Sequence, residues 1–280
     1  MDPELHFGHF SAIREYRQVN RELIEAVFTF LPPTFYHVDI ATGTGLVPQL
    51  MIEEAEKRGY SGTIIGIDPN RDSLNIARAR TRSSDNVSVT FIEGYGQETE
   101  SLVGERIPAA GADMVSIHDA IHEVKGEASK REIFAAMAHI LKPGGVLTYN
   151  SAFTSIATGD AALEWGKWKA RALKELGKRR DRAIEAIRRH TPEEYMGMMG
   201  DEGLVVVHEA AKAVALTKKA IWAISQYPEF IQGVFRDMLN EGARPTLKGM
   251  SEALVVAYES LQKDTLPMVW HEVIAQKPVT

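Results

Sequence analysis

The chain has 280 residues, of which 44% are apolar and 25% charged, so it has room for one α/β core with insertions. The formal net charge of -6 gives no reason to expect nucleic acid as a partner. Without cysteine, disulfides, thiolate metal sites and a cysteine nucleophile are excluded. The sequence shows no export signal and no apolar run near the roughly 18 residues of a membrane span. We therefore expect a cytoplasmic protein with no membrane span.

The first 150 residues alternate short apolar runs with helical patterns. Apolar side chains three and four residues apart predict a helix over residues 11–30, which Pro32 and Pro33 end. We expect strands near residues 36–40, 63–67, 87–92, 113–117 and 146–150, with helices near 47–57, 71–82 and 130–141. This alternation indicates an α/β protein with a doubly wound sheet and helices on both faces. Ligands of such sheets bind at the carboxyl ends of the strands.

Helical patterns dominate after residue 150. A long helix is expected over residues 160–189, with an apolar stripe formed by Trp165, Trp168, Ala172, Leu176, Ala183 and Ile187. The basic residues between Lys167 and Arg189 are interpreted mainly as a solvated face, although they would also suit an acidic substrate. Thr191 and Pro192 predict the start of a short helix. A strand at 204–209, a mainly helical stretch at 217–264 and a last strand at 268–276 follow.

The segment VDIATGTG, residues 38–45, ends the first strand in a glycine loop. A dinucleotide loop would continue Gly43-x-Gly45 with a third glycine, but Pro48 stands there, and no phosphate-loop motif is present. Asp68, 23 residues after Gly45, ends the next strand and would suit the two hydroxyls of a ribose. Asp39 beside the loop would suit a cationic group of the ligand. Adenosine together with a cation indicates a sulfonium cofactor.

Five motifs resemble a known family. VDIATGTG, GIDPN, FIEGYGQE, DMVSIHDAIHEV and ILKPGGVL resemble, in order and spacing, the motifs of class I S-adenosylmethionine-dependent methyltransferases. The resemblance covers roughly residues 34–151 and the last strand. Ala41, where many members have a glycine, is similar to the variant in quinone-biosynthesis methyltransferases. The resemblance implies S-adenosyl-L-methionine as cofactor and a Rossmann-like, mainly parallel seven-stranded sheet with an N-terminal cap helix and helical insertions.

The resemblance also implies which residues contact the cofactor. Its methionine part and backbone would be held by Asp39, Ala41, Gly43 and Gly45. Asp68 would bind the ribose, Pro69 or Asn70 would flank the adenine, and Gly96 would line it. His118 and Asp119 would face the methionine part or the reacting methyl group.

The adenine motif departs from the family pattern. Gly94-Tyr95-Gly96 stands where the family commonly has Gly-Asp-Ala. Tyr95 cannot replace the carboxylate that accepts from the adenine amino group, although it could stack on the ring. The N-terminal segment with Phe10, Ile13 and Tyr16 resembles the cap helix that closes over the methyl group in many such enzymes, and this resemblance implies that Tyr16 contacts the cofactor. Ordinary core packing of Phe10 and Ile13 explains the same pattern equally well.

These expectations divide the chain into four parts. Residues 1–33 would form the cap helix, 34–151 the cofactor-binding core and 152–203 a helical insertion. Residues 204–280 would supply the last two strands, with a helical lid inserted at 217–264. Trp222, Tyr227, Phe230 and Phe235 in the lid would build an apolar chamber for a small molecule. Core packing of the lid helices explains most of these aromatic residues as well.

The resulting functional prediction is transfer of a methyl group to an O, C or N atom of a small, partly apolar metabolite. A hydroxyl acceptor would need a base, and His118 and His122 are the candidates. We expect them on one face of a short helix with Asp119 and Glu123. These side chains could also hold a metal, but two histidines at this spacing without HExxH are a weak signal, and no metal is assigned.

Other functions are open at this stage. The chain could bind S-adenosylmethionine as a cyclase-like catalyst or as a non-catalytic binding module, which the sequence does not separate from a transferase. An NAD(P)-dependent oxidoreductase on the same sheet is less favoured, because Pro48 replaces the third glycine. A homodimer is left open.

Overall fold

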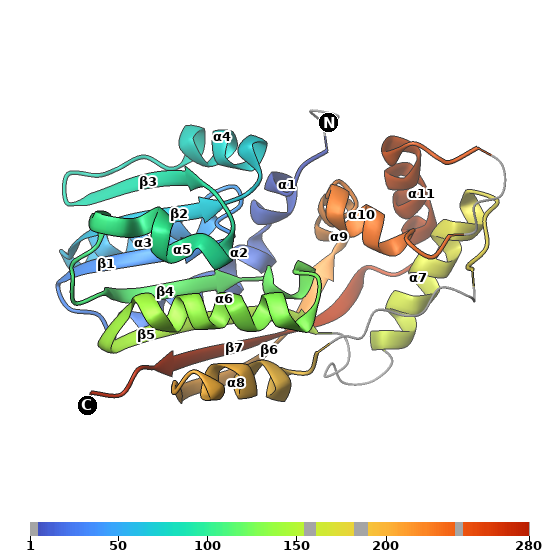
Figure 1. Cartoon of the computed structure of the whole chain (residues 1–280). Helices are drawn as coiled ribbons and strands as arrows, with labels where there is room; N and C mark the ends of the chain where they lie inside the picture. The colour runs from blue at the N-terminus through green and yellow to red at the C-terminus, as the bar shows by residue number, and fades with distance from the viewer. Residues whose placement is uncertain (1–4, 154–160, 182–189, 239–242, 280) are drawn as a thin grey trace. The chain divides into compact units, whose positions relative to one another are not determined.

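The computed structural model describes residues 5–153, 161–181, 190–238 and 243–279 (Figure 1). The chain divides into two units. The sheet unit comprises residues 18–152, 189–212 and 270–280, and the helical unit comprises residues 1–17, 153–188 and 213–269. Each unit is thus built from three separate segments of the chain.

The sheet has the seven strands expected from the sequence, in the order β3-β2-β1-β4-β5-β7-β6. Strand β1 pairs in parallel with β2 and β4, β2 pairs in parallel with β3, and β4 pairs in parallel with β5. The bounds are β1 Thr34–Ile40, β2 Ser61–Asp68, β3 Val87–Glu93, β4 Ala112–His118, β5 Leu141–Phe153, β6 Val205–Thr217 and β7 Thr265–Gln276. The strand positions predicted before residue 150 are confirmed.

The sheet is mixed rather than purely parallel. The Gly144 N–H donates to the Lys277 carbonyl at 2.8 Å, and the Lys277 N–H donates to the Gly145 carbonyl at 2.9 Å. Gly144 and Gly145 lie near the start of β5, whereas Lys277 follows the end of β7, so these strands run in opposite directions. The arrows of β4 and β7 accordingly point in opposite directions in Figure 1. The predicted sheet is mainly parallel, and the antiparallel pairing lies at the β5–β7 edge.

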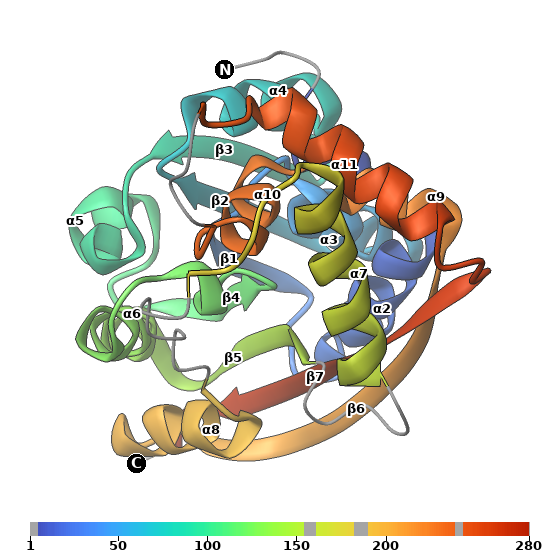
Figure 2. The same cartoon turned by 90° about the vertical axis from the view of Figure 1, so that its right-hand side faces the viewer.

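Helices cover both faces of the sheet, as Figure 2 shows. On one face lie α2, Arg14–Val27, and α3, Leu46–Arg58, whereas α5, Thr99–Val103, α6, Glu127–Ile140, and α8, Pro192–Asp201, lie on the other. Helix α4, Arg71–Arg80, connects β2 to β3. The sequence prediction of the start of α8 is confirmed, because the Glu194 N–H donates to Thr191 Oγ1 and Pro192 is the first helical residue.

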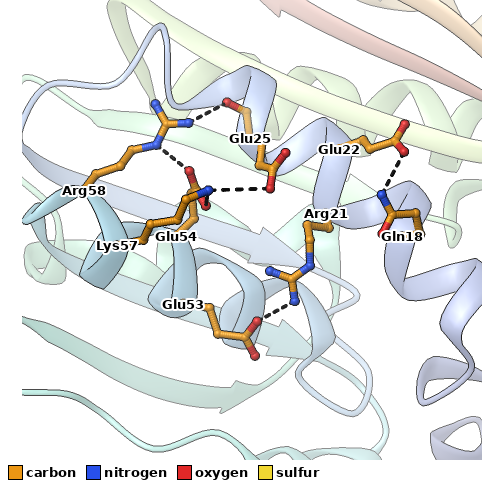
Figure 3. Close-up of polar contacts among 8 residues, drawn as sticks. All are labelled: Gln18, Arg21, Glu22, Glu25, Glu53, Glu54, Lys57 and Arg58. Carbon is orange, nitrogen blue, oxygen red and sulfur yellow. Dashed lines mark hydrogen bonds and ion pairs between the residues drawn. The ribbon is translucent and has the colours of Figure 1, made fainter.

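Helix α2 is fixed to the sheet unit by an apolar face and by charges. Its side chains Leu23, Ile24 and Val27 are buried. Its Arg21 Nη2 lies 2.6 Å from Glu53 Oε2 of α3 (Figure 3). The helix predicted over residues 11–30 is confirmed with shorter bounds as α2, and a separate short helix, α1, Gly8–Ser11, precedes it.

The helical unit contains α1, α7, Ala161–Glu175, α9, Lys218–Ile224, α10, Pro228–Val234, and α11, Leu247–Glu259. Trp168 of α7 joins two of its neighbours: Nε1 donates to the Leu254 carbonyl of α11 at 2.7 Å, and its ring stacks on Phe230 of α10. The helix predicted over 160–189 is wrong in length. It ends at Glu175, and Gly177 follows with φ 64°, a conformation that interrupts helices. Ala183 and Ile187 lie outside the described residues.

Candidate functional site

The loop after β1 has a left-handed backbone at three positions: φ is 54° at Ala41, 53° at Gly43 and 82° at Gly45. Ala41 pays a steric cost there that glycine would avoid. A Cβ at Gly45 would lie 2.7 Å from Thr81 Oγ1, which donates to the Gly45 carbonyl at 3.2 Å. The glycine at position 45 is therefore required by packing within the protein, whatever the loop binds.

Asp68 closes this loop from the end of β2. Its Oδ2 accepts from the Gly43 N–H and its Oδ1 from the Asn70 N–H, both at 2.8 Å. Burial raises the pKa of Asp68 above its ordinary value, although the two amide donors oppose that shift. Pro69, the next residue, is exposed. Asp68, the residue predicted to bind the ribose, is thus joined to the predicted glycine loop by a direct hydrogen bond from the Gly43 N–H.

Asp39 lies beside the same loop but in different surroundings. Its side chain is buried, and Oδ1 accepts from the Ser116 hydroxyl of β4 at 2.5 Å. Since that hydroxyl donates to Asp39, it accepts from His37 Nε2, which is 2.7 Å away. Burial raises the pKa of Asp39 to about 7, although the neighbouring Ser116 and Thr42 hydroxyls favour the charged form. Asp39 Oδ2 has no hydrogen-bond partner among the described residues.

The predicted adenine loop follows β3. The Gly94 N–H donates to the Asp68 carbonyl at 3.2 Å, which ties this loop to the end of β2. A Cβ at Gly96 would lie 2.8 Å from Ile40 Cγ2, so glycine permits close packing on β1. The Tyr95 side chain is 62% exposed, and its backbone N–H donates to Glu98 Oε2. The exposed ring is thus available for stacking, whereas Glu98 is engaged within the loop.

The structure separates the two candidate bases. His118 is the last residue of β4 and is buried, with Nδ1 2.9 Å from Asn20 Oδ1 and Nε2 3.0 Å from Thr148 Oγ1. Burial lowers the pKa of His118 to about 3. His122 is exposed in a short 3-10 helix, Ile121–Glu123, with Nδ1 2.9 Å from Ser151 Oγ. The expectation that both lie on one helix is therefore wrong, because β4 continues through His118.

Asp119 makes the turn between these two histidines. It is not a glycine, yet its φ is 52°, a conformation that asparagine and aspartate adopt more readily than most residues. Its Oδ1 accepts from the Ala152 N–H at 3.2 Å, and its own N–H donates to the Asn150 carbonyl at 2.9 Å. Burial of the carboxylate raises the pKa of Asp119 to about 7.

Tyr16, the remaining predicted cofactor contact, belongs to the helical unit. It is buried there, and its ring centroid lies 5.7 Å from that of Phe7 and 5.0 Å from that of Phe10. The ring of Tyr227 from the 217–264 segment also contacts Phe7, at 4.9 Å. Phe10 and Ile13 are buried, and so is Phe235 in the other segment, as core packing requires.

Sequence reasoning missed the polar side chains that surround the predicted site residues. Asn20, Ser116, Thr148, Asn150 and Ser151 are all buried. Their signal in the sequence was weak but present, because polar residues interrupt otherwise apolar strands in MVSIH and VLTYNS. The described residues contain no group of three or more metal-ligating side chains and no helix long and apolar enough to cross a membrane.

Part of the chain matches a known protein family. Residues 38–147 match the family model described as "Methyltransferase domain". No curated protein matches the chain in sequence. The domain matched spans the glycine loop, Asp68, the adenine loop and the turn at Asp119.

Solved structures share the fold at low sequence identity. A methyltransferase of Methanosarcina mazei, described as SAM-dependent, has a TM-score of 0.52 and 15% identity, covering 91% of this chain and 98% of its own. Loganic acid methyltransferase, solved with SAH, has a TM-score of 0.57 and 10% identity, covering 96% and 94%. The [4+2]-cyclase SpnF has a TM-score of 0.53 and 18% identity, covering 95% and 82%. The fold is that of S-adenosylmethionine-dependent methyltransferases.

Proposed function

We propose that the protein is an S-adenosylmethionine-dependent methyltransferase of the EC 2.1.1 type that acts on a small, partly apolar metabolite. The observation that carries the proposal is the pair of acids at the glycine loop. Asp68 is hydrogen-bonded to the loop backbone, and Asp39 is buried beside it with an unpartnered oxygen. A nucleoside with a cationic substituent has complementary groups for both acids.

The residues present fit this cofactor. Each carboxylate oxygen of Asp68 accepts one amide bond and retains a second lone pair for a ribose hydroxyl. Asp39 would face a positive charge that offsets the cost of burying its ionised form. Tyr95 would stack on the adenine, and Gly96 and Pro69 would line it. The cofactor, when bound, supplies a methyl group on a sulfonium.

His122 is the proposed base if the acceptor is a hydroxyl. Both ring nitrogens of His118 are engaged by Asn20 and Thr148, and burial disfavours its protonation. His122 is exposed, and Ser151 orients its ring through Nδ1. His118 is accordingly assigned to holding the cofactor site rather than to proton transfer. Catalysis would otherwise rest on alignment and on exclusion of water.

Cofactor binding without methyl transfer is the second candidate. The specific observation is that a [4+2]-cyclase shares the fold, so the fold alone does not decide the reaction. The roles of Tyr16 as a cap residue and of residues 217–264 as a lid stay predictions, as do the cytoplasmic location and a homodimer.

The test begins with the wild-type protein and S-adenosylhomocysteine in a calorimeter, and with mass spectrometry of candidate acceptors for a gain of one methyl group. Asp68→Asn tests the ribose contact. It should weaken S-adenosylhomocysteine binding by about 10- to 100-fold, the range for a lost charged hydrogen bond. Asp85→Asn, an exposed acid in the loop before β3, is the control.

A 2′-deoxy analogue separates the ribose contact from damage to the loop. Wild type should bind this analogue weakly, and Asp68→Asn should weaken it further by much less than it weakens the parent ligand. Equal losses for both ligands would refute the ribose contact. A wild-type protein that binds no S-adenosylhomocysteine would refute the proposed function.

A further inference from the structure

A buried hydrogen-bond network joins α2 to the ends of β4 and β5. Asn20 of α2 is fully buried, and its Oδ1 lies 2.9 Å from His118 Nδ1 and accepts from Asn150 Nδ2 at 3.0 Å. Thr148 Oγ1 lies 3.0 Å from the other ring nitrogen of His118. All four residues belong to the sheet unit, and one amide oxygen is shared by the two strands.

This arrangement fixes the tautomer of His118. The Asn20 oxygen can only accept, so Nδ1 of His118 must carry the proton and donate it. Nε2 then carries a lone pair and accepts from the Thr148 hydroxyl. The ring is neutral, because both of its nitrogens are satisfied without a second proton and burial disfavours the charged form.

The network acts on the turn that follows β4. Asn150 is linked to Asn20 by its side chain, and its carbonyl accepts from the Asp119 N–H at 2.9 Å. His118 directly precedes Asp119 in the chain. The strained backbone of Asp119, with φ 52°, is therefore held from two sides by groups that converge on Asn20.

We propose that Asn20 is a positioning residue for the cofactor site: acting through His118 and Asn150, it holds the turn at Asp119 against the methionine part of the ligand. This inference rests on the proposed function for the identity of the ligand. In this role Asn20 does not touch the reacting atoms. Helix α2 then contributes to the cofactor site as well as packing on the sheet.

Simple packing does not account for an asparagine at this position. Leu23, Ile24 and Val27 of the same helix already provide its apolar face, and a buried amide is costly unless it is hydrogen-bonded. A satisfied buried network gains specificity of geometry, because each partner must be in place for the others to be satisfied.

The first experiment needs no substitution. In wild-type protein labelled with 15N-histidine, the His118 ring should show the Nδ1-protonated neutral tautomer, with its resonances assigned by their loss in His118→Gln. In Asn20→Asp, a carboxylate replaces the shared acceptor and should raise the pKa of His118, so that the imidazolium form appears at higher pH than in wild type. A wild-type ring protonated on Nε2 would overturn the proposal.

The second experiment measures ligand affinity. Asn20→Leu deletes the shared acceptor, and we expect S-adenosylhomocysteine binding to weaken by about tenfold, the effect of losing roughly one hydrogen bond. Gln18→Leu, which removes only an exposed bond to Glu22 on the same helix, should bind like wild type. Asn20→Asp, which can still accept both bonds, should stay within about threefold of wild type. Wild-type affinity in Asn20→Leu would overturn the proposal.

Folding and ligand identity are kept separate from this result. If Asn20→Leu does not fold, Asn20→Ala, which deletes the shared acceptor without adding bulk, takes its place, and wild-type affinity in that variant would overturn the proposal. If wild-type protein binds no S-adenosylhomocysteine, the proposed function fails, and the amide resonance of Asp119 in unliganded Asn20→Leu, or in Asn20→Ala if Asn20→Leu does not fold, then decides. An unchanged Asp119 resonance would show that Asn20 does not act on the turn and would overturn the proposal.

Discussion

Two acids at the same glycine loop are held in opposite ways. Asp68 accepts from two backbone amides, those of Gly43 and Asn70, so the chain itself supplies partners for its negative charge. Asp39 accepts from one hydroxyl, that of Ser116, and its second oxygen is unpartnered among the described residues. Burial raises the pKa of both carboxyl groups, but at Asp68 the two amide donors oppose this shift, whereas at Asp39 a cationic ligand would relieve the buried charge.

The most direct test of this difference is to replace each of the two acids with asparagine. Because the pKa of Asp39 in the folded state, about 7, lies above its usual value of 3.8, the folded protein binds that proton more tightly than the unfolded chain. Its stabilising contribution is therefore complete below about pH 4 and is lost as the pH rises to about 7. Asp39→Asn removes the ionisable group and should be the more stable protein at pH 8, by up to about 4 kcal/mol.

At Asp68 the same change should have the opposite sign. An amide offers only one oxygen, so Asp68→Asn leaves either the Gly43 or the Asn70 N–H without its acceptor, at a cost of about 1–3 kcal/mol at pH 8. Urea unfolding of both variants between pH 4 and 8 measures the two effects. Two substitutions of the same sign at pH 8 would contradict the distinction between the acids.

The next substitution sharpens the role of the hydroxyl beside Asp39. Ser116→Ala deletes the donor to Asp39 and the acceptor of His37, both of which are buried. We expect a loss of about 1–3 kcal/mol in the free energy of unfolding. Ser88→Ala, which removes an exposed bond from Ser88 of β3 to Thr63 of β2, should change the free energy of unfolding by less than about 0.5 kcal/mol. Equal effects of the two serines in denaturant titrations would exclude a special role for Ser116.

The sequence predicts the surroundings of Asp68 more fully than those of Asp39. The backbone partners of Asp68 follow from local order, because a strand, a glycine loop and the end of the adjacent parallel strand come together in any such sheet. The partners of Asp39 and His118 come from Ser116, Thr148 and Asn20, which are distant in sequence and fixed only by register and by the placement of α2. The sequence showed these residues as polar interruptions but not which atoms they contact.

Helical periodicity failed where the chain changes conformation abruptly. The spacing of His118 and His122 is that of one helix turn, but β4 runs through His118 and the turn at Asp119 follows. Lys and Arg residues between 171 and 180 continue a plausible helix, yet α7 ends at Glu175 before the left-handed Gly177. In both cases a single positive φ, invisible to periodicity, ends the element.

The smallest expected effect concerns the loop that Asp68 closes. Gly45 and Gly59 both have positive φ, 82° and 69°, but a Cβ at Gly45 would meet Thr81 Oγ1 at 2.7 Å, whereas nothing lies within 4 Å of one at Gly59. Alanine at either position incurs the backbone cost of about 1 kcal/mol. Gly45→Ala should be less stable than Gly59→Ala by a further 1 kcal/mol or so, since the loop and the end of α4 must separate.

The double variant Gly45→Ala/Thr81→Ser separates the clash from the backbone cost. Serine keeps a hydroxyl but not the methyl group, so its Oγ can rotate away from the new Cβ. The extra loss of stability caused by Gly45→Ala should therefore be smaller in the Thr81→Ser background. Thermal or urea unfolding measures this difference as a coupling energy. Equal losses in Gly45→Ala and Gly59→Ala would mean that the loop moves freely against α4. That result would show that the glycine loop is not rigid. The contrast between Asp68 and Asp39, which depends on a rigid loop, would then be refuted.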